Sequence, residues 1–187
     1  MNLVETLLSG AGSSALNELA KNFNLDSNQV SAVVKQLAPA LGRGITKNTQ
    51  NASGLEGLLD ALNKGNHERY LDDPAQLNTE AAVQDGNGIL GHLFGTKEVS
   101  REVARRASSQ TGVSDALIKK MLPMVAGMVM GSLRKQQQTQ PNFAETLGQA
   151  KAQPSQAGGL LNSFLDADGD GSMVDDLIGM AGKFLSR

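Results

Sequence analysis

Five aspartates near the C-terminus carry the clearest chemical pattern in this sequence. Asp166, Asp168 and Asp170 alternate in the run D-A-D-G-D-G-S. Alternating carboxylates can converge on one hard cation, a glycine after the third carboxylate permits a sharp turn, and the backbone carbonyl of Ser172 can supply a further oxygen. Because Ca²⁺ is bound through oxygen ligands of this kind, the spacing predicts a calcium site.

The run resembles the first half of the calcium loops of EF-hand and dockerin proteins, and it departs from them at its end. Those loops need an acidic ligand at the twelfth position, where this chain has Leu177, while Asp176 and Asp175 fall one and two places early. If the following helix begins early, Asp176 completes the shell. The alternative is that Asp168 and Asp170 only shape a turn and cap the last helix.

The composition favours helices as the elements that position these residues. Of the 187 residues, 40% are hydrophobic but only 3% are aromatic, so the core must consist of Leu, Val, Ile, Ala and Met. No stretch alternates β-branched or aromatic residues with polar ones over enough positions to form a sheet. We therefore predict an all-α protein. The absence of Cys excludes disulfides, thiolate zinc sites and cysteine nucleophiles.

Two helix pairs of the same design recur along the chain. Apolar residues follow a helical period over 16–23 and again over 30–45. Between them, Asn24 suits a left-handed turn and Asp26 suits a helix N-cap. Shifting the pattern by 88 residues places Gly112 on Asn24 and Ser114 on Asp26. This repeat predicts two related helical halves built from helix-turn-helix units, and chance agreement of two amphipathic helix pairs is the alternative.

A second repeat suggests how the chain is divided. The motif D-G-N-G at 85–88 and the motif D-G-D-G at 168–171 each predict a turn that leads into a helix. Polar segments predict loops over much of 63–88 and over 136–142 and 151–159. The expected parts are an N-terminal helical repeat (1–65), a loop and connecting turn and helix (66–96), a second helical repeat (97–150), and a linker with a C-terminal helix-loop-helix (151–187).

Four stretches of the sequence together resemble a bacterial family of unknown function typified by the YidB protein. They are MNLVETLLSGAGSSALNELA, DGNGILGHLFG, LPMVAG and FLDADGDGSMVDDLIG. The resemblance spans most of the chain. It implies an all-helical fold with a homeodomain-like arrangement, and it implies no established activity.

Nucleic-acid binding is the alternative function that the charge pattern suggests. Residues 97–135 hold eight basic residues against three acidic ones, whereas the whole chain has a net charge of −2. A local excess of this kind can contact a phosphate backbone, and a solvated helix face carries such charges equally well. The candidate residues are Arg101, Arg105, Arg106, Lys119 and Lys120.

The remaining chemical groups do not form a catalytic motif. His67 lies in a polar segment that predicts exposure to solvent, and His92 lies in an apolar helix that predicts packing in the core. The methionine-rich run 121–130 is too short to span a membrane, so it predicts a buried helix. On that helix, Gly127 and Gly131 allow another helix or a second copy to approach closely.

The sequence thus predicts a non-enzymatic helical scaffold that binds a protein partner or itself. A calcium ion at the Asp-rich loop is its expected cofactor. Because the first residues do not have the pattern of a secretory signal, we expect a cytoplasmic protein without a membrane span.

Overall fold

The computed structural model describes residues 3–139, and all regular structure in this range is helical. The predicted all-α class is therefore confirmed. The elements are α1 (Leu3–Leu8), α2 (Gly10–Phe23), α3 (Ser27–Thr49), α4 (Ala52–Lys64), α5 (Arg69–Asp72), the short 3-10 helix η1 (Pro74–Asn78), α6 (Glu80–Phe94), α7 (Lys97–Thr111) and α8 (Asp115–Thr139).

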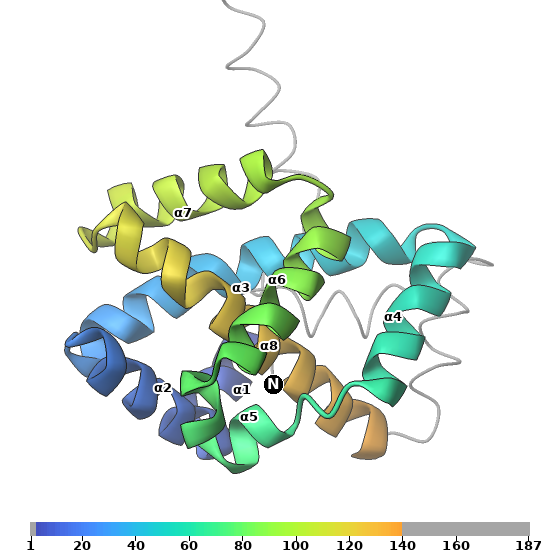
Figure 1. The fold of residues 1–187 in the computed structure, drawn as a ribbon, viewed down its shortest axis with the longest axis horizontal. Coiled ribbons are helices and arrows are strands. Elements are labelled where there is room, and N and C mark those ends of the chain that lie inside the picture. The colour runs from blue at the N-terminus through green and yellow to red at the C-terminus, as the bar shows by residue number, and fades with distance from the viewer. Residues whose placement is uncertain (1–2, 140–187) are drawn as a thin grey trace, which may run out of the picture.

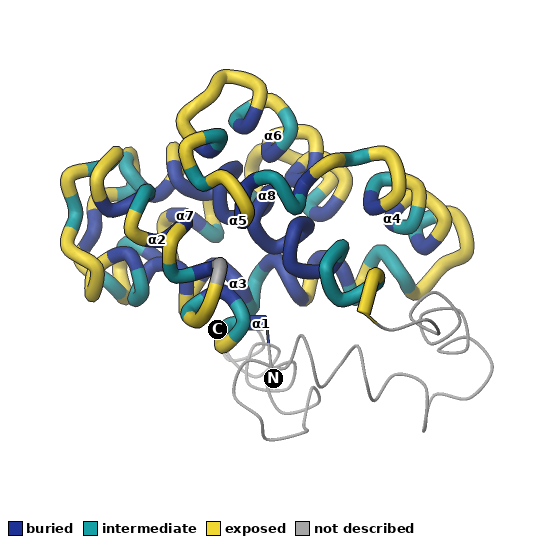
Figure 2. Tube along the Cα trace, turned by 90° about the horizontal axis from the view of Figure 1, so that it is seen from below, coloured by how far each residue is buried: buried dark blue, intermediate teal, exposed yellow. Residues whose placement is uncertain are grey.

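Helix α8 runs through the centre of the domain. Figure 1 shows α6 crossing it on one side and α3 on the other, with α7 and α4 toward the edges. Every residue from Met121 to Leu133 is buried, so this stretch contacts protein on all sides. Figure 2 shows the same pattern, with buried residues gathered around α8 and exposed residues at the periphery.

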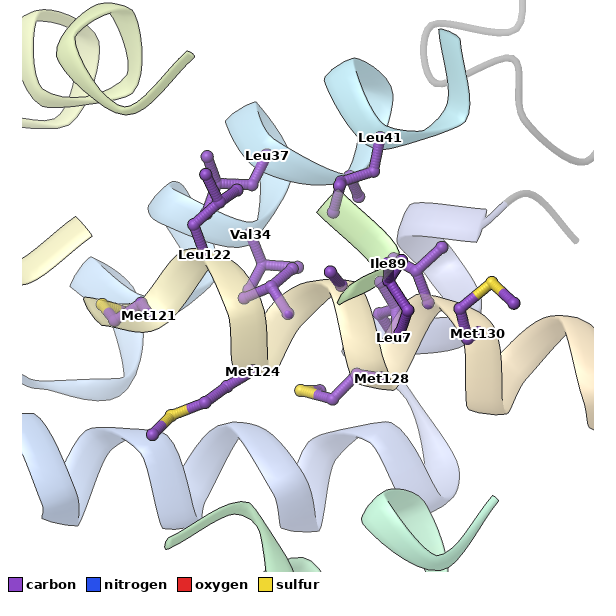
Figure 3. Close-up of a cluster of buried hydrophobic side chains, with 14 of the residues drawn as sticks. Leu7, Val34, Leu37, Leu41, Ile89, Met121, Leu122, Met124, Met128 and Met130 are labelled. Carbon is purple, nitrogen blue, oxygen red and sulfur yellow. The ribbon is translucent and has the colours of Figure 1, made fainter. Parts of the chain in front are cut away.

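The methionines of α8 fill the core, as the sequence predicted. Each of them is at most 9% exposed, and Figure 3 shows them among side chains from α1, α3 and α6. Methionine is unbranched and flexible, so it can fill the irregular gaps between helices that cross at different angles. The residues are Met121, Met124, Met128 and Met130.

The length and apolar composition of α8 raise the question whether it spans a membrane. Among the described helices, α8 is the one with the length and apolar character of a membrane span, and 78% of its most apolar window is buried inside the domain. A core helix of a water-soluble protein has the same two properties. Burial of this window therefore accounts for its apolar composition.

Both predicted helix pairs form, with the turns at the predicted residues. Asn24 ends α2 in the left-handed conformation with φ 51°, and Gly112 ends α7 in the same region with φ 73°. Asp26 caps α3 through a capping box with Gln29. The backbone N–H of Leu117 donates to the Ser114 hydroxyl at 3.4 Å at the start of α8.

Positions 88 residues apart have the same burial in the two second helices. Val30 and Ile118 are both buried, and so are the pairs Val33 and Met121, Leu37 and Val125, Leu41 and Val129, and Ile45 and Leu133. This agreement is what an internal duplication would produce. The duplication itself and the homeodomain-like arrangement stay predictions.

The D-G-N-G motif at 85–88 is not a turn, contrary to the prediction. It lies inside α6, whose N-terminus is capped by the Thr79 hydroxyl accepting from the Ala82 backbone N–H. Gly86 is buried where α6 crosses α8. The tertiary contact stabilises a helix at a motif that would otherwise favour a turn.

Two segments predicted as loops, 63–88 and 136–142, also contain helical residues. Residues 63–88 contain the end of α4, α5, η1 and the first half of α6. Helix α8 continues to Thr139, into the segment predicted as a loop from 136. These polar helical turns contact the domain through side-chain hydrogen bonds, which the apolar periodicity could not indicate.

We expect Gly86→Ala to destabilise the domain. A Cβ at this position would lie 2.0 Å from the carbonyl oxygen of Pro123, and that atom belongs to backbone that cannot rotate away. Overpacking of this kind costs about 1–3 kcal/mol or more. Urea unfolding monitored by circular dichroism measures the loss.

The matched control is Gly88→Ala in the same helix, where a Cβ would meet nothing within 4 Å. Alanine has a higher helix propensity than glycine by about 1 kcal/mol, so this variant should be at least as stable as the parent. Equal effects of the two substitutions would contradict the close packing of α6 against α8.

Candidate functional site

The predicted calcium ligands lie outside the described residues. These are Asp166, Asp168, Asp170, Ser172 and Asp176. Within residues 3–139, no group of three or more His, Cys, Asp or Glu side chains could hold a metal ion. The calcium site therefore stays a prediction from the sequence.

Most of the predicted nucleic-acid residues pair with acidic neighbours on their own helix. Arg105 contacts Glu102 at 2.6 Å, and Arg101 contacts Glu98 at 3.5 Å. Lys119 contacts Asp115 at the start of α8. Alternating charges on a helix are typical of a solvated face.

Arg106 and Lys120 are the two of the five candidates that form no ion pair in the described part of the chain. Both are exposed. Helix α8 is fully buried from Met121 to Leu133, so only its ends are accessible. The buried middle of α8 thus cannot lie along a nucleic-acid groove, whereas its first turns remain available.

A polar cluster that the sequence analysis missed lies where the segment 67–72 meets α8. His67 is only 7% exposed, although its polar surroundings in the sequence predicted exposure. His92, predicted to be packed in the core, is exposed on α6. Both predictions were wrong because sequence neighbours do not reveal which side of a segment faces another helix.

Two glycines of α8 bring this segment close. A Cβ on Gly131 would lie 2.6 Å from the carbonyl oxygen of His67, and a Cβ on Gly127 would lie 3.1 Å from the ring of Tyr70. The prediction that these glycines allow a close approach is confirmed by these contacts. The element that approaches is the segment around α5 of the same chain.

Arg69 and Tyr70 join this segment to Asp85 of α6 and contact each other. Arg69 Nη2 lies 2.7 Å from Asp85 Oδ2 and donates to the Tyr70 hydroxyl at 2.8 Å. The Tyr70 hydroxyl donates to the same Asp85 oxygen at 2.5 Å. The guanidinium also lies over the tyrosine ring, 4.9 Å from its centroid.

The electrostatics of this trio favour a structural role over acid–base chemistry. Burial, together with the hydrogen bond to Asp85, raises the pKa of Tyr70 above its ordinary value. The pKa of Arg69 is raised, mainly by its hydrogen bond to the Tyr70 oxygen. The phenol thus stays protonated as a donor and the guanidinium stays charged, so neither group serves as a base near neutral pH.

A second set of polar contacts joins the same segment to the end of α8. Glu68 lies 3.8 Å from Arg134 Nε and accepts a hydrogen bond from Gln138. Asp72 forms an ion pair with Lys135. Together the two sets attach the 67–72 segment to α6 and α8. The α5 latch is our name for these residues: Glu68, Arg69, Tyr70, Asp72, Asp85, Arg134, Lys135 and Gln138.

The comparisons with known proteins agree with this description of the chain. A family model described as a bacterial protein of unknown function (DUF937) matches residues 5–136. The chain belongs to this family. It is the YidB-like family that the sequence motifs indicated, and the matched range nearly coincides with the described helical domain. No curated protein and no solved structure matched the chain.

The Asp-rich loop lies beyond the matched range of the family. All residues of the α5 latch except Gln138 lie inside the matched range. The family match therefore concerns the helical domain and not the Asp-rich loop. The family description assigns no activity to it.

We expect the stability of the domain to decrease as the pH falls below neutrality, in part through His67. Burial lowers the pKa of His67 below its ordinary value of 6.5, an effect that Asp85 and Glu68 partly oppose. The unfolded chain then binds a proton more readily than the folded one. The stabilisation is full above pH 6.5 and is lost as the pH falls from there through the lower folded-state pKa.

Denaturant unfolding at pH 5 to 8 measures this effect. One buried histidine contributes a slope of at most about 1.4 kcal/mol per pH unit. His67→Gln should flatten the decrease, and His92→Gln, which replaces an exposed histidine, should leave it unchanged. A wild-type slope that survives His67→Gln would show that another group causes it.

Proposed function

We propose that this protein is a non-enzymatic binding protein, in which a rigid helical domain supports a C-terminal calcium site and contacts a protein partner. The observation that carries the non-enzymatic part is the α5 latch. Its chemically capable groups bind one another across helix contacts, as Tyr70, Arg69 and Asp85 do. Groups engaged in this way stabilise a scaffold, and the Tyr70 proton is already donated to Asp85.

The calcium part rests on the spacing of the aspartates. Asp166, Asp168 and Asp170 supply alternating carboxylates, and the carbonyl of Ser172 supplies a neutral oxygen. Asp176 is the nearest substitute for the acidic ligand missing at Leu177. A shell with one displaced carboxylate should bind more weakly than a complete loop, toward the millimolar end of the range known for such sites.

Calorimetric titration of Ca²⁺ into the chelator-treated full chain tests this proposal, with thermal melts in parallel. We expect micromolar to millimolar binding and a raised melting temperature, because an ion that binds only the folded state stabilises it. The double variant with Asp168→Asn and Asp170→Asn should lose both effects.

The control variant carries Glu56→Gln and Asp60→Asn, which remove the same number of carboxylates from the exposed face of α4. It should bind Ca²⁺ as the parent does. Titration heats that are absent in the parent, or unchanged when Asp168 and Asp170 are replaced, would reject the calcium site.

Nucleic-acid binding is the alternative proposal, and the unpaired cations Arg106 and Lys120 support it. It predicts that a short duplex DNA shifts in a gel at low salt and that the shift disappears steeply as salt rises. Arg106→Gln with Lys120→Gln should weaken the shift. Replacing Lys21 and Lys64, which pair with acidic neighbours elsewhere on the surface, is the control. No shift at low salt would remove this alternative.

A further inference from the structure

Helix α3 carries positive charge without any acidic counterpart. Between Asp26 and Glu56 the sequence contains no acidic residue, and its charged residues are Lys35, Arg43 and Lys47. All three are exposed. None of them forms an ion pair or a side-chain hydrogen bond within the described part of the chain.

These cations share one face of the helix. Lys35, Arg43 and Lys47 are separated by eight and four residues, which places all three within an arc of about 120° around the helix. The opposite side is buried against the core through residues such as Val34, Leu37 and Leu41 (Figure 3). At 1.5 Å per residue the three charges extend over about 18 Å. We call this surface the α3 basic face.

The basic residues of α7 lie in a different charge environment. There, Arg101 and Arg105 each pair with a glutamate on the same helix. A partner of negative charge would have to compete with those glutamates. On the α3 basic face it would meet no acidic residue of that helix, so no charge of α3 itself repels it.

The chain itself contains a segment of complementary charge. Residues 152–182 include five aspartates and no Lys or Arg. The aspartates lie between Asp166 and Asp176, which are ten residues apart. A stretch of this length covers about 15 Å if helical and about 33 Å if extended, so it can match the three cations in either conformation.

The tether between the two is long enough. The described domain ends at Thr139, and Asp166 follows 27 residues later. Fully extended, 27 residues reach about 90 Å, which exceeds the diameter of a domain of this size. A partner linked covalently within that reach has a higher effective concentration than a free one, so contacts that are individually weak can still be populated.

We propose that the acidic segment 166–176 docks on the α3 basic face of its own chain. The docking depends only on the charges described above. Its release by Ca²⁺, in contrast, rests on the proposed calcium site. The ion would neutralise the same carboxylates that the cations attract, so binding of Ca²⁺ and docking compete.

Carbodiimide cross-linking of the full chain in a chelator, followed by peptide mass spectrometry, tests the docking. The reagent joins carboxylates to amines in contact. We expect links from Lys35 and Lys47 to the 166–176 peptide in preference to links from Lys119 or Lys120. A mixture of isotope-labelled and unlabelled protein identifies the links that form within one chain.

The decisive variant is Arg43→Gln, because it removes the central cation and leaves both reactive amines in place. We expect it to lower the yield of the Lys35 and Lys47 links about two- to fivefold, as the loss of one exposed charge contact would. Arg106→Gln, which removes an exposed arginine from α7, should leave the yield unchanged. A thermal melt of each variant confirms that it folds.

Three outcomes would overturn the docking: no preference for the α3 lysines, an equal yield in Arg43→Gln, or links that form only between two chains. The last would identify a second copy as the occupant. Saturating Ca²⁺ should reduce the links. If links form in chelator and Ca²⁺ has no effect on them, the docking stands and its release by calcium is rejected, while the titration above judges the calcium site independently.

Discussion

The burial of α8 on all sides is the constraint on which the rest of the fold depends. A helix that is apolar around its whole circumference over Met121–Leu133 cannot lie at a surface, so other elements must cover every side. Helices α3, α6 and α7 supply three of the covers, and the short α5 supplies another. Methionines adapt to the different crossing directions, and glycines allow the closest ones.

The elements that approach α8 most closely explain where the polar contacts of the α5 latch lie. Gly86 lets α6 approach the backbone of Pro123, and Gly127 and Gly131 let the α5 segment approach the same helix. Such a short segment buries little apolar surface, so its attachment depends on side-chain contacts at its edges. The latch around Tyr70 and Asp85 provides them. Partly exposed polar residues thus stabilise the attachment of a short element.

Local signals in the sequence identified the helix pairs correctly, because caps and turns depend on neighbouring residues. Asn24 and Gly112 illustrate this, since each adopts the left-handed conformation that its residue type favours. The D-G-N-G motif and the two histidines were misjudged, because their environment is set by contacts with α8 far away in the sequence. Gly127 and Gly131 signalled a close approach, and nothing in their spacing indicated which element approaches. The predicted metal ligands lie outside the described residues.

The distribution of charge on the surface helices differs from one helix to the next. The helices around α8 bury their apolar residues against it and have polar outer faces. Val99 is the one large hydrophobic residue that is exposed in the described part of the chain. The proposed docking is accordingly electrostatic, and an electrostatic contact requires charges that are not already neutralised. Helix α7 pairs Arg101 and Arg105 with its own glutamates, whereas none of the cations of α3 forms an ion pair within residues 3–139. The number of basic residues in a segment is therefore a poor guide to its binding capacity, and the arrangement of acidic neighbours decides which helix can bind an anion.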